Sequence, residues 1–211
     1  RDERFQIVDI SRITSPDDSR VAAYRNVRDA DLLAGGGVFM AEGRFVVRTL
    51  LLQSPLRCRS VLVTETALES VRDAIEALPA PPPVLLASQE VMNTVVGFDI
   101  HRGCLAVGER PTAGSVESIL TRCAGADPAA SGIVVLENLT NHDNVGGIFR
   151  SALALGASAL LLSPGCCDPL YRKSIRVSMG AALRLPYGTV ADWPAGLLAL
   201  KEAGFTVAAL A

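Results

Sequence analysis

The sequence predicts an α/β protein, because short apolar runs rich in β-branched residues alternate with segments of helical periodicity along most of its 211 residues. The composition agrees with this class, since aromatic residues make up only 5% of a chain that is 49% hydrophobic, and aliphatic side chains dominate the rest. The chain is long enough for two modest domains. We therefore expect a small α/β sandwich followed by a second domain with a parallel sheet.

The first domain is expected over residues 1–110. Residues 1–17 are polar, and the cluster Thr14-Ser15-Pro16-Asp17-Asp18 predicts the start of a helix that runs to Arg28, continues over 31–33 and ends at glycines 35–37. Strands are predicted over 38–41, 61–63, 84–86 and 104–107, and helices over 44–53, 69–78 and 89–95. A stiff proline-rich connector covers 79–83.

Residues 111–131 are rich in Ala, Gly, Ser and Pro, and they predict an interdomain linker with one turn of helix at 116–122. The second domain is expected over 132–211. Its predicted strands start at 133 and cover 159–163, 183–185 and 205–210, and its helices follow Asn144, begin at Pro169 and cover 193–203. In such a sheet, ligands sit beyond the carboxyl ends of the strands.

The segment after the strand at 133 most constrains function. Polar turn formers follow this strand, and Ile148, Ala152 and Leu155 then recur at helical spacing, with Asn144 as the expected N-cap. Gly146 and Gly147 would each cost about 1 kcal/mol in the first turn, so a ligand or a second backbone should approach them closely.

Arg150 in the first two turns of this helix would oppose the helix dipole, and a bound anion would reverse that effect. The alternative is that the glycines only let the helix pack tightly on a sheet while Arg150 reaches solvent.

A second basic segment follows Asp168 and Pro169, which predict a helix start with Asp at the N-cap. Helical spacing places Arg172 and Arg176 on one face with Lys173 beside them and no acidic residue between, as expected for a phosphate-binding patch. The alternative is a solvated face. Ser178 could hold a phosphate or only cap a turn.

Two spaced motifs resemble the first part of the SpoU/TrmH-type RNA 2′-O-ribose methyltransferases of the SPOUT class: Asn144-x-Gly146-x-x-x-Arg150-x-Ala152 and Asp168-Pro169-x-x-x-Lys173-x-x-Arg176-x-Ser178-x-Gly180. The phrase Ala41-Glu42-Gly43-Arg44 and the loop 97–103 are similar to the small substrate-binding domain that precedes the catalytic domain in many such enzymes.

The resemblance implies that the chain transfers a methyl group from S-adenosylmethionine to a ribose 2′-hydroxyl of structured RNA, with rRNA expected before tRNA. It also implies a homodimer and a trefoil-knot type of catalytic domain. The implied catalytic residues are Arg150 and Asn144, and the implied RNA-binding residues are Arg44, Arg102, Arg172, Lys173, Arg176 and Ser178. Because an arginine side chain is a poor ordinary base, Arg150 is expected first to position phosphate and stabilise the alkoxide, with direct proton removal as a second role that the resemblance suggests.

The later family motifs that build the knot and most of the cofactor pocket have no counterpart before Ala211. We expect a missing C-terminal part, only a remnant of the cofactor site at Leu210 and Ala211, and no activity of these residues alone. The competing hypotheses are a non-catalytic RNA-binding module and a Rossmann-like nucleotide-binding enzyme. The latter is disfavoured because the strand-to-helix loop is too long and lacks the glycine spacing.

The charge and the cysteine content limit which classes of function remain. A net charge of −2 counts against a polyanion binder, although 18 of the 20 basic residues are arginine, which suits phosphate and base contacts or reflects a GC-rich gene. The five cysteines are odd in number and lack a C-x-x-C pair, so free thiols are expected and a structural zinc site is not. Neither histidine has metal-ligand spacing, and His142 is expected to be a loop residue. With no membrane span or signal peptide visible, the expected location is cytoplasmic.

Overall fold

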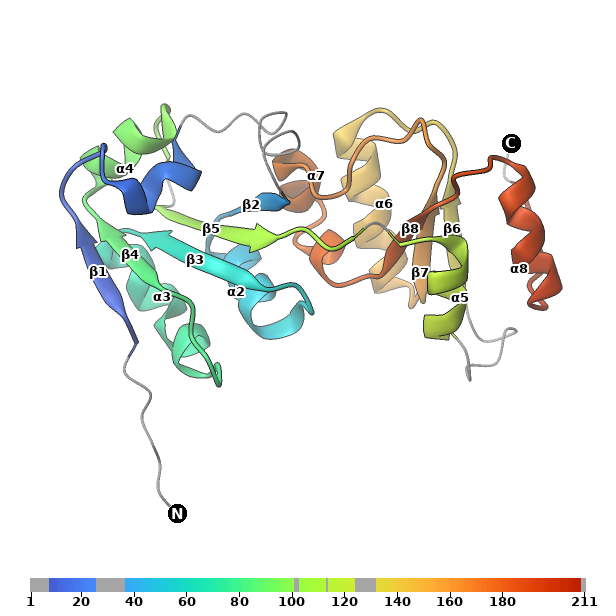
Figure 1. Cartoon of the computed structure of the whole chain (residues 1–211), viewed down its shortest axis with the longest axis horizontal. Coiled ribbons are helices and arrows are strands. Elements are labelled where there is room, and N and C mark those ends of the chain that lie inside the picture. The colour runs from blue at the N-terminus through green and yellow to red at the C-terminus, as the bar shows by residue number, and fades with distance from the viewer. Residues whose placement is uncertain (1–7, 26–36, 101–102, 113, 124–131, 210–211) are drawn as a thin grey trace, which may run out of the picture.

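The computed structural model describes residues 8–25, 37–100, 103–112, 114–123 and 132–209. Figure 1 shows two α/β halves side by side along the long axis, each built on its own sheet. The N-terminal half contains a five-stranded sheet of order β1-β4-β3-β5-β2, and the C-terminal half a three-stranded sheet of order β6-β7-β8. Within the described ranges, no helix is long and apolar enough to cross a membrane.

The N-terminal half is a three-layer sandwich. Its strands are β1 (Ile10–Ile13), β2 (Val38–Glu42), β3 (Cys58–Val63), β4 (Val84–Ala87) and β5 (Cys104–Glu109). Its helices are the 3-10 helix η1 (Ser19–Tyr24), α2 (Arg44–Gln53), α3 (Glu65–Glu76) and α4 (Gln89–Val96). Strands β1, β4 and β3 are parallel, whereas β5 runs antiparallel to both β3 and β2.

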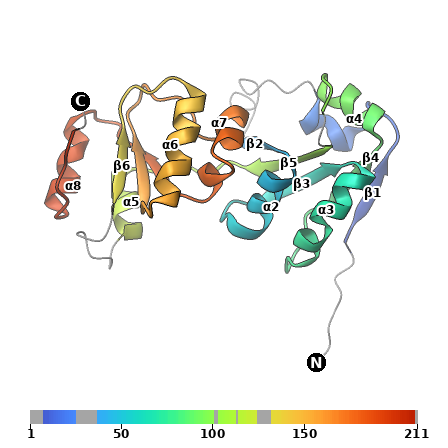
Figure 2. The same cartoon turned by 180° about the vertical axis from the view of Figure 1, so that it is seen from behind.

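Alternation along the strands builds these layers, because successive side chains of a strand point to opposite faces. Phe39 and Ala41 of β2 join the core beneath α2 and α3, whereas Met40 between them joins the core beneath η1 and α4. Figure 2 shows α2 and α3 together on one face of this sheet. The four strands and three helices predicted between residues 38 and 107 are confirmed, although α3 begins four residues earlier than expected.

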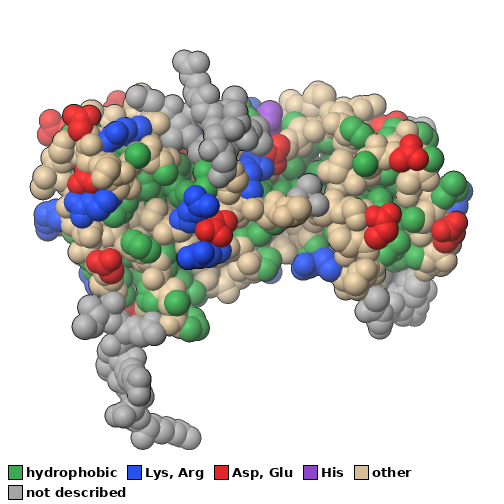
Figure 3. All heavy atoms as spheres, viewed as in Figure 1, with side chains coloured by type: hydrophobic (Ala, Val, Ile, Leu, Met, Phe, Trp, Pro, Cys, Tyr) green, Lys and Arg blue, Asp and Glu red, His purple; other side chains and the backbone are tan. Residues whose placement is uncertain are grey.

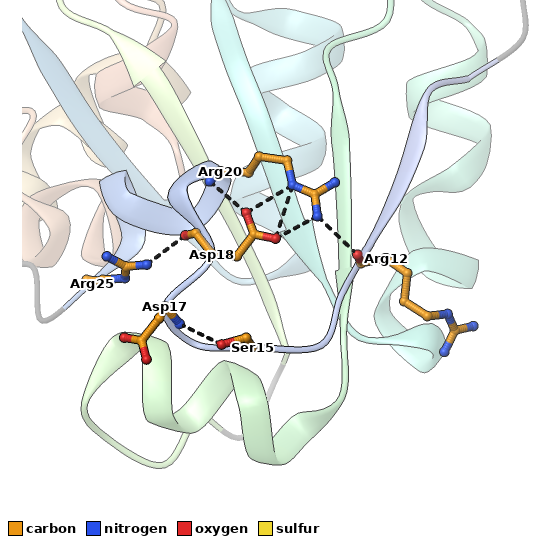
Figure 4. Close-up of polar contacts among 6 residues, drawn as sticks. All are labelled: Arg12, Ser15, Asp17, Asp18, Arg20 and Arg25. Atoms are coloured by element: carbon orange, nitrogen blue, oxygen red, sulfur yellow. Dashed lines mark hydrogen bonds and ion pairs between the residues drawn. The ribbon is translucent and has the colours of Figure 1, made fainter.

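The segment before residue 26 differs from the prediction in two ways. Ile10–Ile13 form the edge strand β1 within the segment that the sequence described only as polar, because Ile10 and Ile13 are separated by two polar residues and show no alternating pattern. The expected long helix is the short η1, and its predicted continuation lies outside the described residues. Figure 4 shows Asp18, the N-cap residue of η1, whose carboxylate accepts hydrogen bonds from the backbone and side chain of Arg20. These bonds lower the pKa of Asp18 to about 2.

The C-terminal half is also three-layered. Its strands are β6 (Ile133–Leu136), β7 (Ala159–Leu162) and β8 (Tyr187–Thr189), all parallel, which confirms the predicted parallel sheet. Its helices are α5 (Val116–Cys123), α6 (His142–Ala154), α7 (Arg172–Val177), η3 (Ala181–Leu183), η4 (Ala195–Leu197) and α8 (Leu198–Glu202). Residues of α6 and η3 pack on one face of the sheet, and residues of α5 and α8 on the other.

Three predictions for the strands and the last helix of this half are wrong. Leu183 and Leu185 are buried at the end of η3 and before β8, so their apolar character reflects packing beside the sheet rather than a strand. The helix expected over 193–203 is reduced to η4 and α8. Residues 205–209 form no strand, and 206–209 are exposed, because no neighbouring strand pairs with them among the described residues.

The two halves share one core. Leu170, Ile175 and Leu183 of the C-terminal half belong to the same buried cluster as Val47 and Leu50 of α2. Polar contacts reinforce this junction: the guanidinium of Arg110 lies 2.6 Å from a carboxylate oxygen of Asp168 and donates to the carbonyl of Val38, and the hydroxyl of Ser54 donates to the carbonyl of Leu183. Since a large apolar interface opposes independent domain motion, we expect the halves to move together.

Candidate functional site

The loop between β6 and α6 is held by the loop that follows β7. The backbone N–H of Asn138, which has a positive φ of 48°, donates to the hydroxyl of Ser163 at 2.8 Å. The N–H of Cys167 donates to the carbonyl of Leu139 at 2.9 Å. A side chain at Gly165 would overlap the amide oxygen of Asn138, so the neighbouring loop needs a glycine there. These contacts fix the start of α6 at the carboxyl edge of the sheet.

Asn141, not Asn144, is the N-cap of α6. Its side-chain oxygen accepts hydrogen bonds from the backbone N–H groups of Asp143 at 2.8 Å and Asn144 at 3.2 Å. Asn144 is exposed within the first turn. The prediction failed because the chain offers asparagine at both positions, and the earlier one satisfies the free N–H groups at the helix start.

The two glycines of α6 play different roles. A Cβ on Gly146 would lie 2.7 Å from the backbone oxygen of Ser174, so this glycine lets α6 and α7 approach closely. The predicted approach of a second backbone is thereby confirmed for Gly146. A Cβ on Gly147 would meet nothing within 4 Å among the described atoms. Gly147 therefore leaves open space on the surface of the helix.

Arg150 is exposed in the third turn of α6, so the dipole argument made from the sequence does not apply to it. Its side chain has no hydrogen bond or ion pair with the residues that the structure describes. Asn144 and Arg150 lie three residues before and after Gly147, the spacing that makes helical residues neighbours. An amide and a guanidinium thus flank the open surface at Gly147.

The basic residues of α7 are paired with acidic side chains from other segments. Glu42 at the end of β2 lies 3.8 Å from Arg172 and 3.4 Å from Arg176, and the Lys173 ammonium lies 2.6 Å from Asp143 of α6. As predicted, no acidic residue lies between these basic residues along α7, but acidic side chains from β2 and α6 contact them in the folded protein. The side chains of Lys173 and Arg176 stay about half exposed, and exposed ion pairs contribute only about 0 to 1 kcal/mol, so a phosphate can compete for them.

Other predicted RNA-binding residues lie apart from this patch. Ser178 is buried, and its hydroxyl donates to the carbonyl of Ile175 and accepts from the N–H of Ala182, which favours the turn-capping alternative. Arg44 donates to the hydroxyl of Ser70 and lines a cavity of about 490 Å³ at the carboxyl ends of β3 and β4. Arg102 lies outside the described residues.

The start of α7 also differs from the prediction. The helix begins at Arg172 with Tyr171 as its N-cap residue, whereas the carboxylate of Asp168 accepts from the N–H of Leu170 in the preceding turn. The ring of Tyr171 packs against that of His142 in a tilted arrangement, with centroids 4.0 Å apart, and Arg172 lies 5.2 Å from the ring centroid of Phe98. His142 is the first residue of α6 rather than a loop residue. Sequence reasoning did not select Tyr171, which occurs in no spaced pattern, and it included Phe98 only as part of the loop 97–103.

The cofactor side of the site is not enclosed by the described residues. The predicted remnant at Leu210 and Ala211 lies outside them. The cavity of about 700 Å³ is lined by residues of both halves and lies at the amino end of β8, away from the carboxyl edge. No three His, Cys, Asp or Glu side chains gather as metal ligands in the described ranges. Burial, the neighbouring Cys166 and Asp168 raise the pKa of the Cys167 thiol, which makes it a weak nucleophile.

Comparisons with known proteins agree on one family. The model described as the SpoU rRNA Methylase family matches residues 131–211. An uncharacterised tRNA/rRNA methyltransferase of Mycobacterium bovis is 38% identical over 209 residues, which cover 96% of this chain and 68% of that protein.

Solved structures of rRNA and RNA methyltransferases share the fold. An S-adenosylmethionine-bound rRNA methyltransferase from Sinorhizobium meliloti matches with a TM-score of 0.66 at 21% identity, over 92% of this chain and 69% of that one. An RNA 2′-O ribose methyltransferase matches with a TM-score of 0.66 at 25% identity, over 92% of this chain and 70% of that one.

Proposed function

Since this chain belongs to the SpoU rRNA methylase family, we propose that it transfers a methyl group from S-adenosylmethionine to a ribose 2′-hydroxyl of RNA, with rRNA as the first candidate substrate and tRNA as the second. Support for the ribose oxygen comes from the similar RNA 2′-O ribose methyltransferase. The cofactor supplies an electrophilic methyl group with a good leaving group, so the protein must mainly align the ribose hydroxyl with that methyl group. Such alignment can lower the activation barrier by up to roughly 7 to 11 kcal/mol.

The observation that carries this proposal is the exposed Arg150 beside the open surface at Gly147. Among the described residues nothing neutralises the guanidinium, and nothing fills the space next to it. A ribose and its phosphate can therefore approach α6 there. We assign Arg150 to phosphate positioning and to stabilising the developing alkoxide, because a guanidinium that stays protonated is a poor base. Asn144, on the other side of Gly147, is assigned to orienting the ribose.

The described residues do not enclose S-adenosylmethionine, so the roles proposed for this chain concern the RNA side of the reaction. We propose Arg172, Lys173 and Arg176 as phosphate contacts and Arg44 and Arg102 as contacts of the N-terminal half with RNA. We further propose a division of the chain into residues 1–110, 111–131 and 132–211, a trefoil-knot arrangement of the last part, and action in the cytoplasm. Helix α5 lies within the predicted linker but packs on the second sheet.

Incubation of the protein with methyl-labelled S-adenosylmethionine and either rRNA or tRNA tests the reaction directly. The expected product carries label in a dinucleotide that survives alkaline hydrolysis, because a methylated 2′-oxygen cannot attack the adjacent phosphate. Label at an alkali-sensitive position would exclude ribose methylation. RNA binding without any transfer would support the non-catalytic binding module instead.

Neutralising the α7 patch should weaken RNA binding and flatten its salt dependence. In Arg172→Gln, Lys173→Gln and Arg176→Gln, each lost phosphate contact should lower the slope of log K against log salt by close to one unit. Titrations of RNA at several salt concentrations measure the slope. Arg72→Gln on α3, where the arginine pairs with Glu76 at i+4, is a matched control. An unchanged slope would assign the patch to a solvated face.

We also propose a homodimer formed through the C-terminal halves, as the family resemblance implies. Strand β6 pairs only with β7 among the described strands, and three of its four residues are partly exposed. Such an edge needs covering, because open strands promote aggregation. Analytical ultracentrifugation should give the dimer mass at micromolar concentration. A stable monomer across that range would contradict the proposal.

A further inference from the structure

We propose that the rings of Phe98, Tyr171 and His142, together with the guanidinium of Arg172, form a stacking platform for unpaired bases of the RNA substrate. This inference rests on the proposed function, which supplies RNA as the ligand. It adds the form in which the RNA must be presented near α7, namely as a single-stranded loop, bulge or end. The four residues are called the stacking platform below.

The first part of the stacking platform is a pair of rings at the junction of α6 and α7. The His142 and Tyr171 centroids lie 4.0 Å apart with an interplanar angle of 36°, and both residues are partly exposed. Ser174 of α7 donates to the carbonyl of His142, and Gly146 allows the two helices to touch. The ring pair is therefore held by two helices that cannot slide independently.

The second part comes from the N-terminal half. Phe98 follows the end of α4 and is 39% exposed, and the Arg172 guanidinium lies 5.2 Å from its ring centroid. Glu42 of β2 lies 3.8 Å from the same guanidinium and attracts it electrostatically. Because Tyr171 and Arg172 are adjacent, both parts of the stacking platform meet at the first residues of α7.

These rings are not explained by core packing. Tyr24, Phe39, Phe149 and Trp193 each belong to or pack against a hydrophobic core, whereas Phe98, Tyr171 and His142 belong to none of the four cores. Phe45 is a further exposed ring outside the cores, but it has no ring or cation contact among the described residues. The arrangement of planar groups at α7 therefore needs another reason.

Base stacking supplies that reason. Unpaired bases stack on aromatic rings and on arginine planes, whereas the bases of a duplex already stack on one another. Lys173 and Arg176, half exposed on the same helix, lie where the backbone phosphates of such a strand would need countercharges. Figure 3 shows Lys and Arg side chains around the middle of the molecule, where the two halves meet.

The test uses a fluorescein-labelled single-stranded oligoribonucleotide, its duplex and an abasic strand of the same length, titrated by fluorescence anisotropy without cofactor. The native protein should bind the single strand more tightly than the other two probes. Tyr171→Ala and Phe98→Ala should each weaken single-strand binding by on the order of tenfold, with an unchanged salt slope because no phosphate contact is lost. Tyr171→Phe keeps the ring and should bind like the native protein.

Two controls separate stacking from folding. Phe45→Ala removes an exposed ring elsewhere and should leave affinity unchanged, and Tyr171→Leu keeps apolar volume without a ring and should lose affinity as Tyr171→Ala does. Native affinity in the Ala variants, or equal binding of the abasic strand, would overturn the stacking platform. Methyl transfer by the native protein is measured in parallel. Ring-dependent binding without any transfer would defeat the proposed enzyme activity and leave the stacking platform standing.

Discussion

Arg150→Ala and Arg150→Lys should both lose methyl transfer by about 10² to 10³-fold, since this is the typical effect of removing one donor that acts on the transition state. Lysine keeps the charge but lacks the planar fork of donors that can contact a phosphate and an alkoxide together. Single-turnover rates with saturating RNA and cofactor measure the loss. A charge effect alone would predict that lysine restores the rate.

Both variants should fold normally, because Arg150 is exposed and has no partner among the described residues. Thermal unfolding provides this check. Arg72→Ala, which removes another exposed helical arginine, should keep the native rate. Normal transfer by both Arg150 variants would remove Arg150 from the catalytic site and leave the open surface at Gly147 without a function.

Gly146→Ala should destabilise the protein by about 1 to 3 kcal/mol, because its methyl group would lie 2.7 Å from the backbone oxygen of Ser174 and a helix backbone must move to admit it. For a chain of this length, that corresponds to a fall in Tm of roughly 2 to 12 °C. Differential scanning calorimetry measures the change. RNA binding should weaken with it, because α7 carries the basic residues and α6 carries Arg150.

Gly147→Ala is the matched control. The same substitution one residue later meets open space, so it should stabilise the helix by about 0.5 to 1 kcal/mol. The two variants are thus expected to shift Tm in opposite directions. Equal shifts would show that helix propensity, rather than the contact between α6 and α7, controls stability here.

Local patterns predicted most of the elements but not how distant segments meet. Periodicity gave α2 its observed bounds, since Val46, Val47 and Leu50 are all buried, as helical spacing requires. Leu183 and Leu185 have the same apolar character for a different reason, because Leu183 fills the junction between the halves and Leu185 packs in the core between α6 and the second sheet. No local pattern distinguishes these two uses of leucine.

The candidate site shows the same limit. Arg150 could be selected from the sequence because its motif is local, and Arg172, Lys173 and Arg176 could be selected because they share one helix. Their neutralisation by Glu42 and Asp143 could not, because these carboxylates come from β2 and α6. The ring contacts of the stacking platform likewise join segments that lie far apart in the chain.

The core shared by the two halves has a consequence for target selection. With Leu170 and Ile175 buried against α2 and Arg110 tied to Asp168, the distance between the N-terminal half and Arg150 is fixed before RNA arrives. The protein would then select its target by a fixed distance between two RNA contacts. The methylated nucleotide would be the one that lies at this distance from the RNA feature bound by the N-terminal half. Changing the length of an RNA stem between that feature and the nucleotide should therefore move or abolish methylation.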